Sequence, residues 1–199
     1  MPRSMHTRFY RGICLLVVCL LGTSGHLMAA STCVPPPVGL VSWWDGDAVS
    51  GTTAQDIYDG NDGTLIGSVT TAPGFVGNAF RFNGVDGKIV IAHETAFDFT
   101  TQVSADAWVF IRGGDGNYQS VVDKGYYSGG PFELRMTREG DPYPVILGCP
   151  DKHVIYFAVT TNNGLRSAGA CITKGVWHHV AGTYDGTAIR FYLDGQIPI

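Results

Sequence analysis

Charged residues are scarce in this sequence, and basic ones are scarcer than acidic ones. Lys and Arg number 13 and Asp and Glu 17 among 199 residues, which gives a formal net charge of −4 at pH 7. A hydrophobic share of 45% with only 15% charged residues excludes an intrinsically disordered chain. The shortage of basic residues argues against a protein that binds nucleic acid through its phosphates, so we expect no nucleic-acid partner.

Long apolar runs are also missing. The apolar run Ile13–Leu21 is far shorter than the roughly 20 residues that a membrane-spanning helix needs. It follows three arginines without an acid and precedes the small residues Ala29 and Ala30, a pattern typical of an export signal. We expect residues 1–31 to be a signal peptide, with an uncleaved membrane anchor as the alternative. The mature chain should then be secreted, extracellular or at the cell surface, without stable membrane insertion.

Few cysteines are left once the signal is removed. The segment holds three basic residues and no acid, so the remaining net charge is 10 − 17 = −7. Such an acidic, exported domain suits cation binding. Cys33, Cys149 and Cys171 remain, and an oxidising compartment allows one disulfide among them. Cys149 and Cys171 flank an apolar run in what reads as a β-meander, so we predict that they pair. Two unpaired thiols are the alternative, and Cys33 has no partner within the chain.

The sequence lacks any long stretch with a helical period, and short apolar or alternating runs take its place. Asp-Gly occurs seven times, a dipeptide that supplies the positive φ angles of tight hairpin turns. This pattern predicts an all-β, antiparallel β-sandwich or jelly roll over residues 40–199, after a stiff Pro-rich lead-in at 32–39. The predicted strands are Leu40–Trp44, Gly63–Ile66, Ala79–Phe82, Lys88–Ala92, Val103–Ile111, Ser120–Val122, Phe132–Met136, Val154–Thr160, Trp177–Tyr184 and Thr187–Leu193.

Four segments resemble a known family. Trp177–Gly195 resembles the W-H-H-V-A-x-T-Y-D-G…Y-x-D-G signature of laminin G-like domains, in the concanavalin A-like lectin and glucanase superfamily. In the same order, Gly39–Trp44 resembles the opening strand, Gly74–Gly84 the G-x-x-G-x-A-x-x-F-x-G segment, and Val103–Val109 the S-A-W-V strand. The resemblance implies a concanavalin A-like sandwich of two curved sheets. Members usually continue for a few more strands, so we expect a C-terminally incomplete domain.

Paired carboxylates for glycan hydrolysis are missing. Glycosidases use two carboxylates across the bond that they cleave, and enzymes of this superfamily carry them in an E-x-D-x-x-E strand. Glu94, Glu133 and Glu139 are the only glutamates, and none of them begins such a motif. The sequence therefore predicts that the chain is not an enzyme, with a remnant glycoside hydrolase as a minor alternative.

One loop is rich in hard oxygen ligands. Asp56, Asp59, Asn61 and Asp62 lie in a Gly-rich stretch, and calcium binds six to eight oxygens of this kind. The resemblance implies a structural calcium here, with Asp56 and Asn61 at matching positions. The alternative is a loop whose side chains hydrogen-bond their own backbone, and the sequence leaves both open. The adjacent His178 and His179 are different, because neighbours on a strand point to opposite faces and cannot easily share a zinc ion.

These observations indicate a recognition or adhesion module that binds a glycan or an extracellular protein. Sugars pack on aromatic rings in polar loops, and the candidates in Gly- or Pro-rich stretches are Tyr118, Tyr126, Tyr127 and Tyr143. The tryptophans lie in predicted strands, where at least half of them should belong to the core. The alternative to recognition is a purely structural or assembly module of a larger surface protein.

Overall fold

The computed structural model describes residues 35–92, 94–113, 116–125, 131–138, 140–142, 144, 147–149 and 153–197. Within these residues the chain is built of strands, joined by turns and one short 3₁₀ helix, η1 (Glu94–Phe97), so the all-β prediction is confirmed. The strands are β1 (Trp44–Ser50), β2 (Thr53–Asp56), β3 (Gly63–Ile66), β4 (Val69–Pro73), β5 (Asn78–Phe82), β6 (Lys88–Ile91), β7 (Val103–Phe110), β8 (Gln119–Asp123), β9 (Phe132–Met136), β10 (Val154–Thr161), β11 (Gly164–Cys171), β12 (Trp177–Tyr184) and β13 (Ile189–Leu193).

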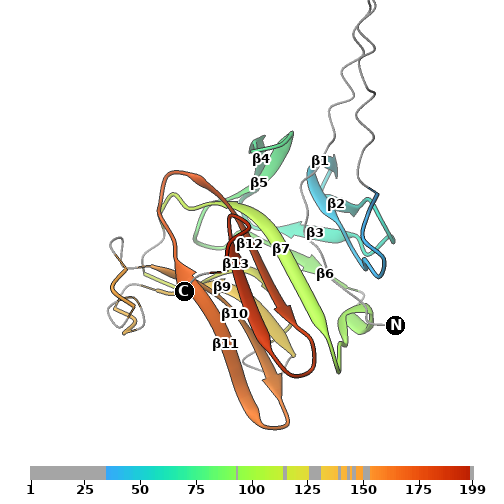
Figure 1. The fold of residues 1–199 in the computed structure, drawn as a ribbon. Coiled ribbons are helices and arrows are strands. Elements are labelled where there is room, and N and C mark those ends of the chain that lie inside the picture. The colour runs from blue at the N-terminus through green and yellow to red at the C-terminus, as the bar shows by residue number, and fades with distance from the viewer. Residues whose placement is uncertain are drawn as a thin grey trace, which may run out of the picture.

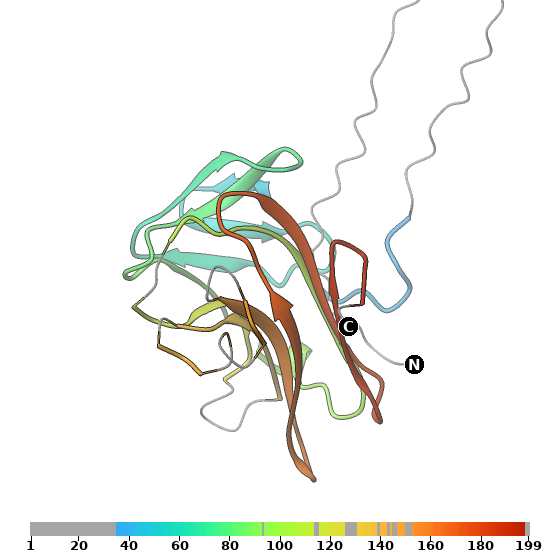
Figure 2. The ribbon, with the colours of Figure 1, turned by 60° about the vertical axis from the view of Figure 1, so that its left-hand side comes forward.

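The strands pair antiparallel in four groups. Their orders are β1-β2-β3-β6, β11-β10-β9-β8, β13-β12-β7 and the hairpin β4-β5. In Figure 1 the β13-β12-β7 sheet runs in front of β9 and β10, and β1, β2, β3 and β6 lie to its right. Figure 2 shows the same groups from another side, with the β10–β11 hairpin reaching below the rest of the molecule.

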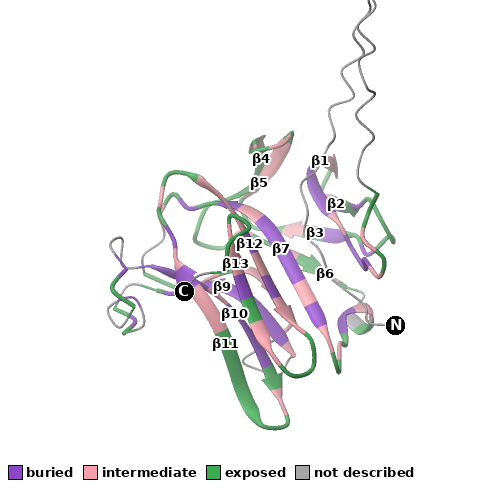
Figure 3. Cartoon of the chain, in the orientation of Figure 1, coloured by how far each residue is buried: buried purple, intermediate pink, exposed green. Residues whose placement is uncertain are grey.

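The two central sheets pack face to face because alternate side chains point inward. Phe132, Leu134 and Met136 of β9 are buried, and so are Val103 and Val180 of the facing sheet. All of them belong to one hydrophobic core. Figure 3 shows that long stretches of β7, β9 and β10 are buried. Burial of apolar surface on both inner faces is the main force that holds such a sandwich together.

One glycine lets the two sheets approach closely. Gly182 of β12 is buried opposite Phe157 of β10, and a Cβ atom on Gly182 would lie 2.0 Å from the Phe157 Cγ. No other residue fits there without moving the ring or the backbone. Glycine inside a strand often marks such a close contact. This glycine lies within the stretch that resembles the laminin G-like signature.

The predicted opening strand is wrong in its bounds. Leu40–Trp44 was expected to be extended, but β1 begins only at Trp44 and continues to Ser50. The Trp43 N–H donates to the Asp56 side-chain carboxylate at 2.8 Å instead of to a backbone carbonyl of the neighbouring strand β2. The Asp45-Gly46 dipeptide lies inside β1 because Gly46 packs against β5, where an added Cβ would be 2.4 Å from the Asn78 carbonyl oxygen.

The prediction that Asp-Gly dipeptides form tight turns holds better in the C-terminal half of the chain than in the N-terminal half. Of the glycines in Asp-Gly dipeptides, Gly60, Gly186 and Gly195 have positive φ angles. Gly46 and Gly63 lie in strands and do not. The strands β4 and β11 were not predicted, because they are largely exposed and lack apolar alternation. The strand β2 was not predicted, because Ala54 is the only apolar residue among its four.

The predicted disulfide is confirmed. Cys149 and Cys171 are bonded with a Cα–Cα distance of 5.2 Å, which joins the end of β11 to the segment 147–149. Cys33 and the expected signal peptide lie outside the described residues. No helix in the described part of the chain is long and apolar enough to cross a membrane.

Candidate functional site

The β2–β3 loop, predicted as a calcium site, is held together by Asp56. This aspartate is buried at the end of β2, and its carboxylate accepts three backbone N–H groups. The donors are Trp43 at 2.8 Å, Tyr58 at 3.0 Å and Asn61 at 3.0 Å. The Asp56 N–H in turn donates to the Asp62 carboxylate at 2.8 Å. Asp56 therefore fastens both the loop and the segment before β1.

Asn61 links the same loop to the opening segment. Its Nδ2 donates to the Ser42 hydroxyl at 2.9 Å and to the Val41 carbonyl at 3.3 Å. The indole N–H of Trp44 donates to the Asn61 carbonyl at 2.9 Å. The structure thus brings Asp56, Asn61 and Asp62 together, with Asn61 buried and Asp62 exposed.

These contacts are those of a loop whose side chains bond its own backbone. A carboxylate offers about four lone-pair positions, so oxygens that accept N–H groups can still bind a metal ion. Asp59 and Asp62 are exposed and supply further hard oxygens. Among the described residues no group of three or more His, Cys, Asp or Glu converges as a metal centre. The calcium site stays a prediction.

A denser set of polar groups lies on the far face of β9. Because Phe132, Leu134 and Met136 point into the core, Glu133 and Arg135 point to the opposite face of the sheet. Both are buried, at 0% and 4% exposure, and the Arg135 Nη1 donates to the Glu133 Oε2 at 2.8 Å. Buried charges cost desolvation free energy, so this pair depends on its close geometry.

Tyr156 lies beside this ion pair. Its register partner on β9 is Arg135, so the phenol shares the polar face of the sheet. Burial raises the pKa of the Tyr156 hydroxyl, and the negative charge of Glu133 raises it further. Tyr156 is therefore a neutral hydroxyl throughout the physiological range, able to donate and to accept hydrogen bonds.

Tyr118 connects the buried pair to the surface. The Arg135 guanidinium lies 3.9 Å from the centroid of the Tyr118 ring, and that of Arg138 lies 5.3 Å away. The Tyr118 hydroxyl donates to the Asp141 Oδ2 at 2.8 Å. We call Tyr118, Arg135, Arg138 and Asp141 the Tyr118 cluster. It joins the segment before β8 to the segment after β9, and Arg138 is its exposed member.

Sequence reasoning found only one member of this cluster. Tyr118 was a candidate because it is aromatic and close to glycines, whereas Arg135, Arg138 and Asp141 carried no motif. The alternation Phe-Glu-Leu-Arg-Met signals one charged strand face, but that pattern is typical of a face exposed to water. Tyr126, Tyr127 and Tyr143, predicted with Tyr118 as sugar-binding residues, lie outside the described residues.

The outer face of the β7–β12 pair carries aromatic rings. Phe75 stacks on Trp108 with ring centroids 3.8 Å apart, and the His179 ring lies 5.3 Å from Trp108. Phe110 and Trp177 form the next pair at 5.5 Å. Trp44 belongs to the core, whereas Trp43, Trp108 and Trp177 are partly exposed. The expectation that at least half of the tryptophans would belong to the core is therefore wrong.

The paired histidines contact different carboxylates. His178 Nδ1 lies 2.8 Å from the Asp194 Oδ2, and His179 Nε2 lies 3.7 Å from the Asp106 Oδ1. The two rings therefore do not point at one metal ion. His178 fastens the turn after β13, where Asp194 has a positive φ of 51°.

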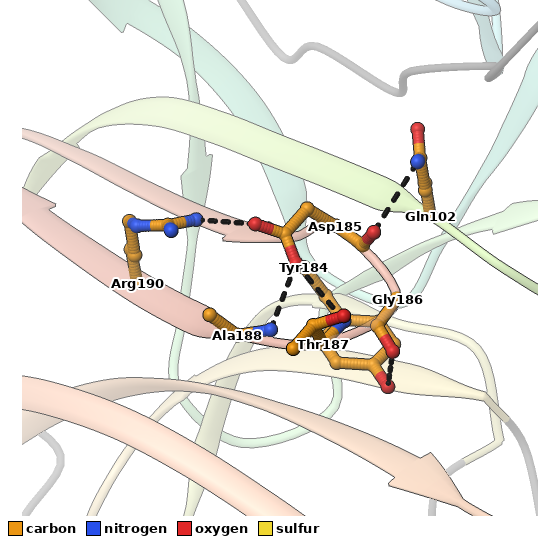
Figure 4. A network of polar contacts seen from close by, with 7 residues as sticks. All are labelled: Gln102, Tyr184, Asp185, Gly186, Thr187, Ala188 and Arg190. Carbon is orange, nitrogen blue, oxygen red and sulfur yellow. Dashed lines mark hydrogen bonds and ion pairs between the residues drawn. The ribbon is translucent and has the colours of Figure 1, made fainter.

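A third polar network closes the β12–β13 turn (Figure 4). The Asp185 carboxylate accepts the N–H groups of Thr187 at 2.9 Å and Ala188 at 2.8 Å. It also accepts a hydrogen bond from Arg190 at 2.7 Å. The contacts of the Asp185 carboxylate lie within the turn and its flanking strand, which makes this a network that stabilises a hairpin. The Asp185 carbonyl also accepts a hydrogen bond at 3.2 Å from the Nε2 of Gln102, the residue before β7.

Comparison with known protein families shows to which superfamily the chain belongs. The sequence model for the concanavalin A-like lectin/glucanases superfamily, in its laminin G-like form, matches residues 83–197, more than half of the chain. The chain belongs to this superfamily. No curated protein and no solved structure gives a match. The laminin G-like resemblance predicted from the sequence is thereby confirmed.

Membership in the superfamily bears differently on the two candidate sites. The match begins just after β5 and includes β6 to β13, so it contains every residue of the Tyr118 cluster. The β2–β3 loop with Asp56 and Asn61 precedes the matched segment. The laminin G-like family therefore supports a binding module in general, and the choice of ligand must come from the chemistry of the sites.

Proposed function

We propose that this laminin G-like chain is an exported, non-catalytic recognition module that binds a carbohydrate at the Tyr118 cluster. The observation that carries the proposal is the arrangement around Tyr118, whose ring and hydroxyl are both fixed by charged partners. Fixing a side chain before the ligand arrives reduces the entropy lost on binding. The disulfide supports export, because such bonds persist in oxidising compartments.

The chemistry of the Tyr118 cluster suits a sugar. Arg138 supplies exposed hydrogen-bond donors, and the buried Asp141 carboxylate holds the Tyr118 hydroxyl in place beside them. Sugars present alternating hydroxyl donors and acceptors together with C–H faces that pack on aromatic rings. Glu133 and Asp141 balance the charges of Arg135 and Arg138, which favours a neutral ligand over a polyanion.

The first test is a glycan-binding panel with the wild-type chain and two arginine variants. Arg138→Gln removes the exposed guanidinium of the cluster, and we expect it to weaken glycan binding at least about tenfold, since a hydrogen bond to a charged group contributes about 1.5–3 kcal/mol and about 1.4 kcal/mol is tenfold. Arg190→Gln is the matched control, because Arg190 is also exposed but lies in β13, away from the Tyr118 cluster, where it pairs with Asp185 of the β12–β13 turn. Binding affinity is read by calorimetry on the best glycan of the panel.

The binding results separate three alternatives: another ligand class, another binding site and a catalytic function. If no glycan binds and an extracellular protein does, the ligand class is wrong although the module still recognises something. If neither variant changes the affinity for a bound glycan, the site lies elsewhere. Release of reducing sugar from a glycan by the wild-type chain would contradict the non-catalytic part of the proposal.

The second part of the proposal is a structural calcium ion at the β2–β3 loop, held by Asp56, Asp59, Asn61 and Asp62. Its support is the donor set, since three carboxylates and an amide lie within one loop. We expect calcium at a hundredfold excess over its Kd to raise the free energy of unfolding by about 2.7 kcal/mol. Thermal melts with calcium and with excess chelator measure this, and Asp59→Asn should reduce the gain. A melting temperature indifferent to calcium would remove the metal from the proposal.

A further inference from the structure

Two Asn-Gly dipeptides lie on the surface of the described chain. Asn83 precedes Gly84 in the turn between β5 and β6, and Asn163 precedes Gly164 at the tip of the β10–β11 hairpin. All four residues are exposed, and both glycines have positive φ angles, 73° and 93°. Asn-Gly is chemically labile because glycine has no side chain to shield its backbone nitrogen from the preceding carboxamide.

The side chain of Asn83 is fully engaged. Its Oδ1 accepts the N–H groups of Val85 at 3.0 Å, Asp86 at 3.2 Å and Gly87 at 3.0 Å. Its Nδ2 donates to the Asp86 Oδ1 at 2.7 Å. The same contact lowers the pKa of the Asp86 carboxyl, which keeps that acceptor ionised. The carboxamide carbon of Asn83 is thus held in an Asx-type turn.

The side chain of Asn163 has no such restraint. Its backbone N–H donates to the Thr161 hydroxyl at 3.2 Å, and that hydroxyl donates to the Gly164 carbonyl at 2.7 Å. Its carboxamide makes no hydrogen bond among the residues that the structure describes. The β10–β11 hairpin reaches beyond the body of the molecule (Figures 1 and 2), and hairpin tips are the parts of a sheet that open most easily.

We propose that Asn163 is a site of spontaneous deamidation, whereas Asn83 is protected by its hydrogen bonds. The Gly164 backbone nitrogen, after loss of its proton to solvent base, attacks the Asn163 Cγ and forms a C–N bond. The Cγ–Nδ2 bond breaks, and the amide nitrogen takes up a proton and leaves as ammonia. Water then opens the resulting cyclic imide at either carbonyl, giving aspartate or isoaspartate, and nothing is oxidised or reduced.

The product differs from the parent chain in charge and in backbone. Either product adds one negative charge to a chain that is already acidic. Isoaspartate also adds a carbon to the main chain next to the Thr161–Gly164 pair, the last pair of the hairpin ladder. Deamidation therefore changes the shape and the charge at the tip of the projecting β10–β11 hairpin.

The test compares the two dipeptides within one sample. The chain is incubated in mildly alkaline buffer, digested at intervals, and both Asn-Gly peptides are quantified by mass spectrometry with an isoaspartate assay. We expect Asn163 to deamidate at least about tenfold faster than Asn83, a ratio that corresponds to about 1.4 kcal/mol. Equal rates, or a faster reaction at Asn83, would overturn the proposal.

Two controls test whether the ratio of the deamidation rates of Asn163 and Asn83 depends on the folded structure. In denaturant both dipeptides should react at similar rates, since the contacts of Asn83 are lost, and a persistent tenfold difference there would show that local sequence is responsible. Asp86→Ala removes the acceptor of the Asn83 Nδ2 at an exposed position and should speed deamidation at Asn83 while leaving Asn163 unchanged. No acceleration at Asn83 would contradict the protective role of its hydrogen bonds.

Discussion

At the scale of single residues, Asp185 shows how one carboxylate can organise a turn. The N–H of Ala188, the guanidinium of Arg190 and the N–H of Thr187 all lower the pKa of the Asp185 carboxyl below its usual value of 3.8. The folded chain therefore binds this proton less readily than the unfolded chain. Its contribution to stability is present above pH 3.8 and is lost as the pH falls through the folded pKa.

Replacing this carboxylate should make the free energy of unfolding depend less on pH in acid. In Asp185→Asn the side-chain oxygen still accepts backbone N–H groups, but the charge that attracts Arg190 is gone. We expect the variant to lose less free energy of unfolding than wild type as the pH drops below 3.8. Urea unfolding at a series of pH values measures this, with Asp59→Asn in metal-free buffer as the control. If the free energy of unfolding fell equally with pH in Asp185→Asn and wild type, the Asp185 carboxyl would not contribute to the loss of stability in acid.

Gly182 is the residue where packing leaves the least room. Gly182→Ala would place its Cβ 2.0 Å from the Phe157 Cγ, so the facing sheets would have to separate locally. We expect a loss of about 1–3 kcal/mol in the free energy of unfolding, typical of overpacked cores. Gly113→Ala is the control, because an added Cβ there meets nothing within 4 Å. Urea titration measures both, and equal losses for the two variants would contradict the steric explanation.

At the scale of elements, strands with apolar alternation could be predicted from sequence and polar ones could not. Phe132–Met136 was predicted with the bounds that β9 has, because Phe132, Leu134 and Met136 make one side of the strand continuously apolar. Trp177–Tyr184 was also predicted with the bounds of β12, where alternating residues end at an Asp-Gly turn. The strand β11 was missed because it is mostly exposed and gains its conformation from pairing with β10. Backbone pairing of this kind depends on a neighbour that a local pattern does not contain.

The candidate sites differ in the same way as the strands: one could be predicted from a local pattern and the other could not. The β2–β3 loop could be predicted because its oxygens are close together in sequence, and Asp56, Asn61 and Asp62 do come together. The Tyr118 cluster could not, because Tyr118 and Asp141 meet only when β8 and β9 pair. The segments that carry them are separated by a complete hairpin, so their hydrogen bond is a product of tertiary structure.

At the scale of the whole molecule, the disulfide ties the edge strand β11 to the rim segment 147–149, which follows Asp141 of the Tyr118 cluster along the chain. Cys171 ends β11, and Cys149 follows the segment that contains Asp141. A bond that closes a loop with a sequence separation of 22 contributes about 3 kcal/mol by restricting the unfolded chain. In a domain of this size that corresponds to a fall of about 6–12 °C in melting temperature when the bond is removed.

The double variant Cys149→Ser and Cys171→Ser tests this contribution without leaving a lone thiol. We expect its melting temperature to fall to that of the wild-type chain treated with reductant, because both lack the same cross-link. If the proposed sugar site depends on a fixed rim, the variant should also bind glycan more weakly at a temperature where it is still folded. An unchanged melting temperature with weaker binding would mean that the disulfide orders the rim locally. A lower melting temperature with unchanged binding would mean that β8 and β9 hold Tyr118 and Asp141 together by themselves.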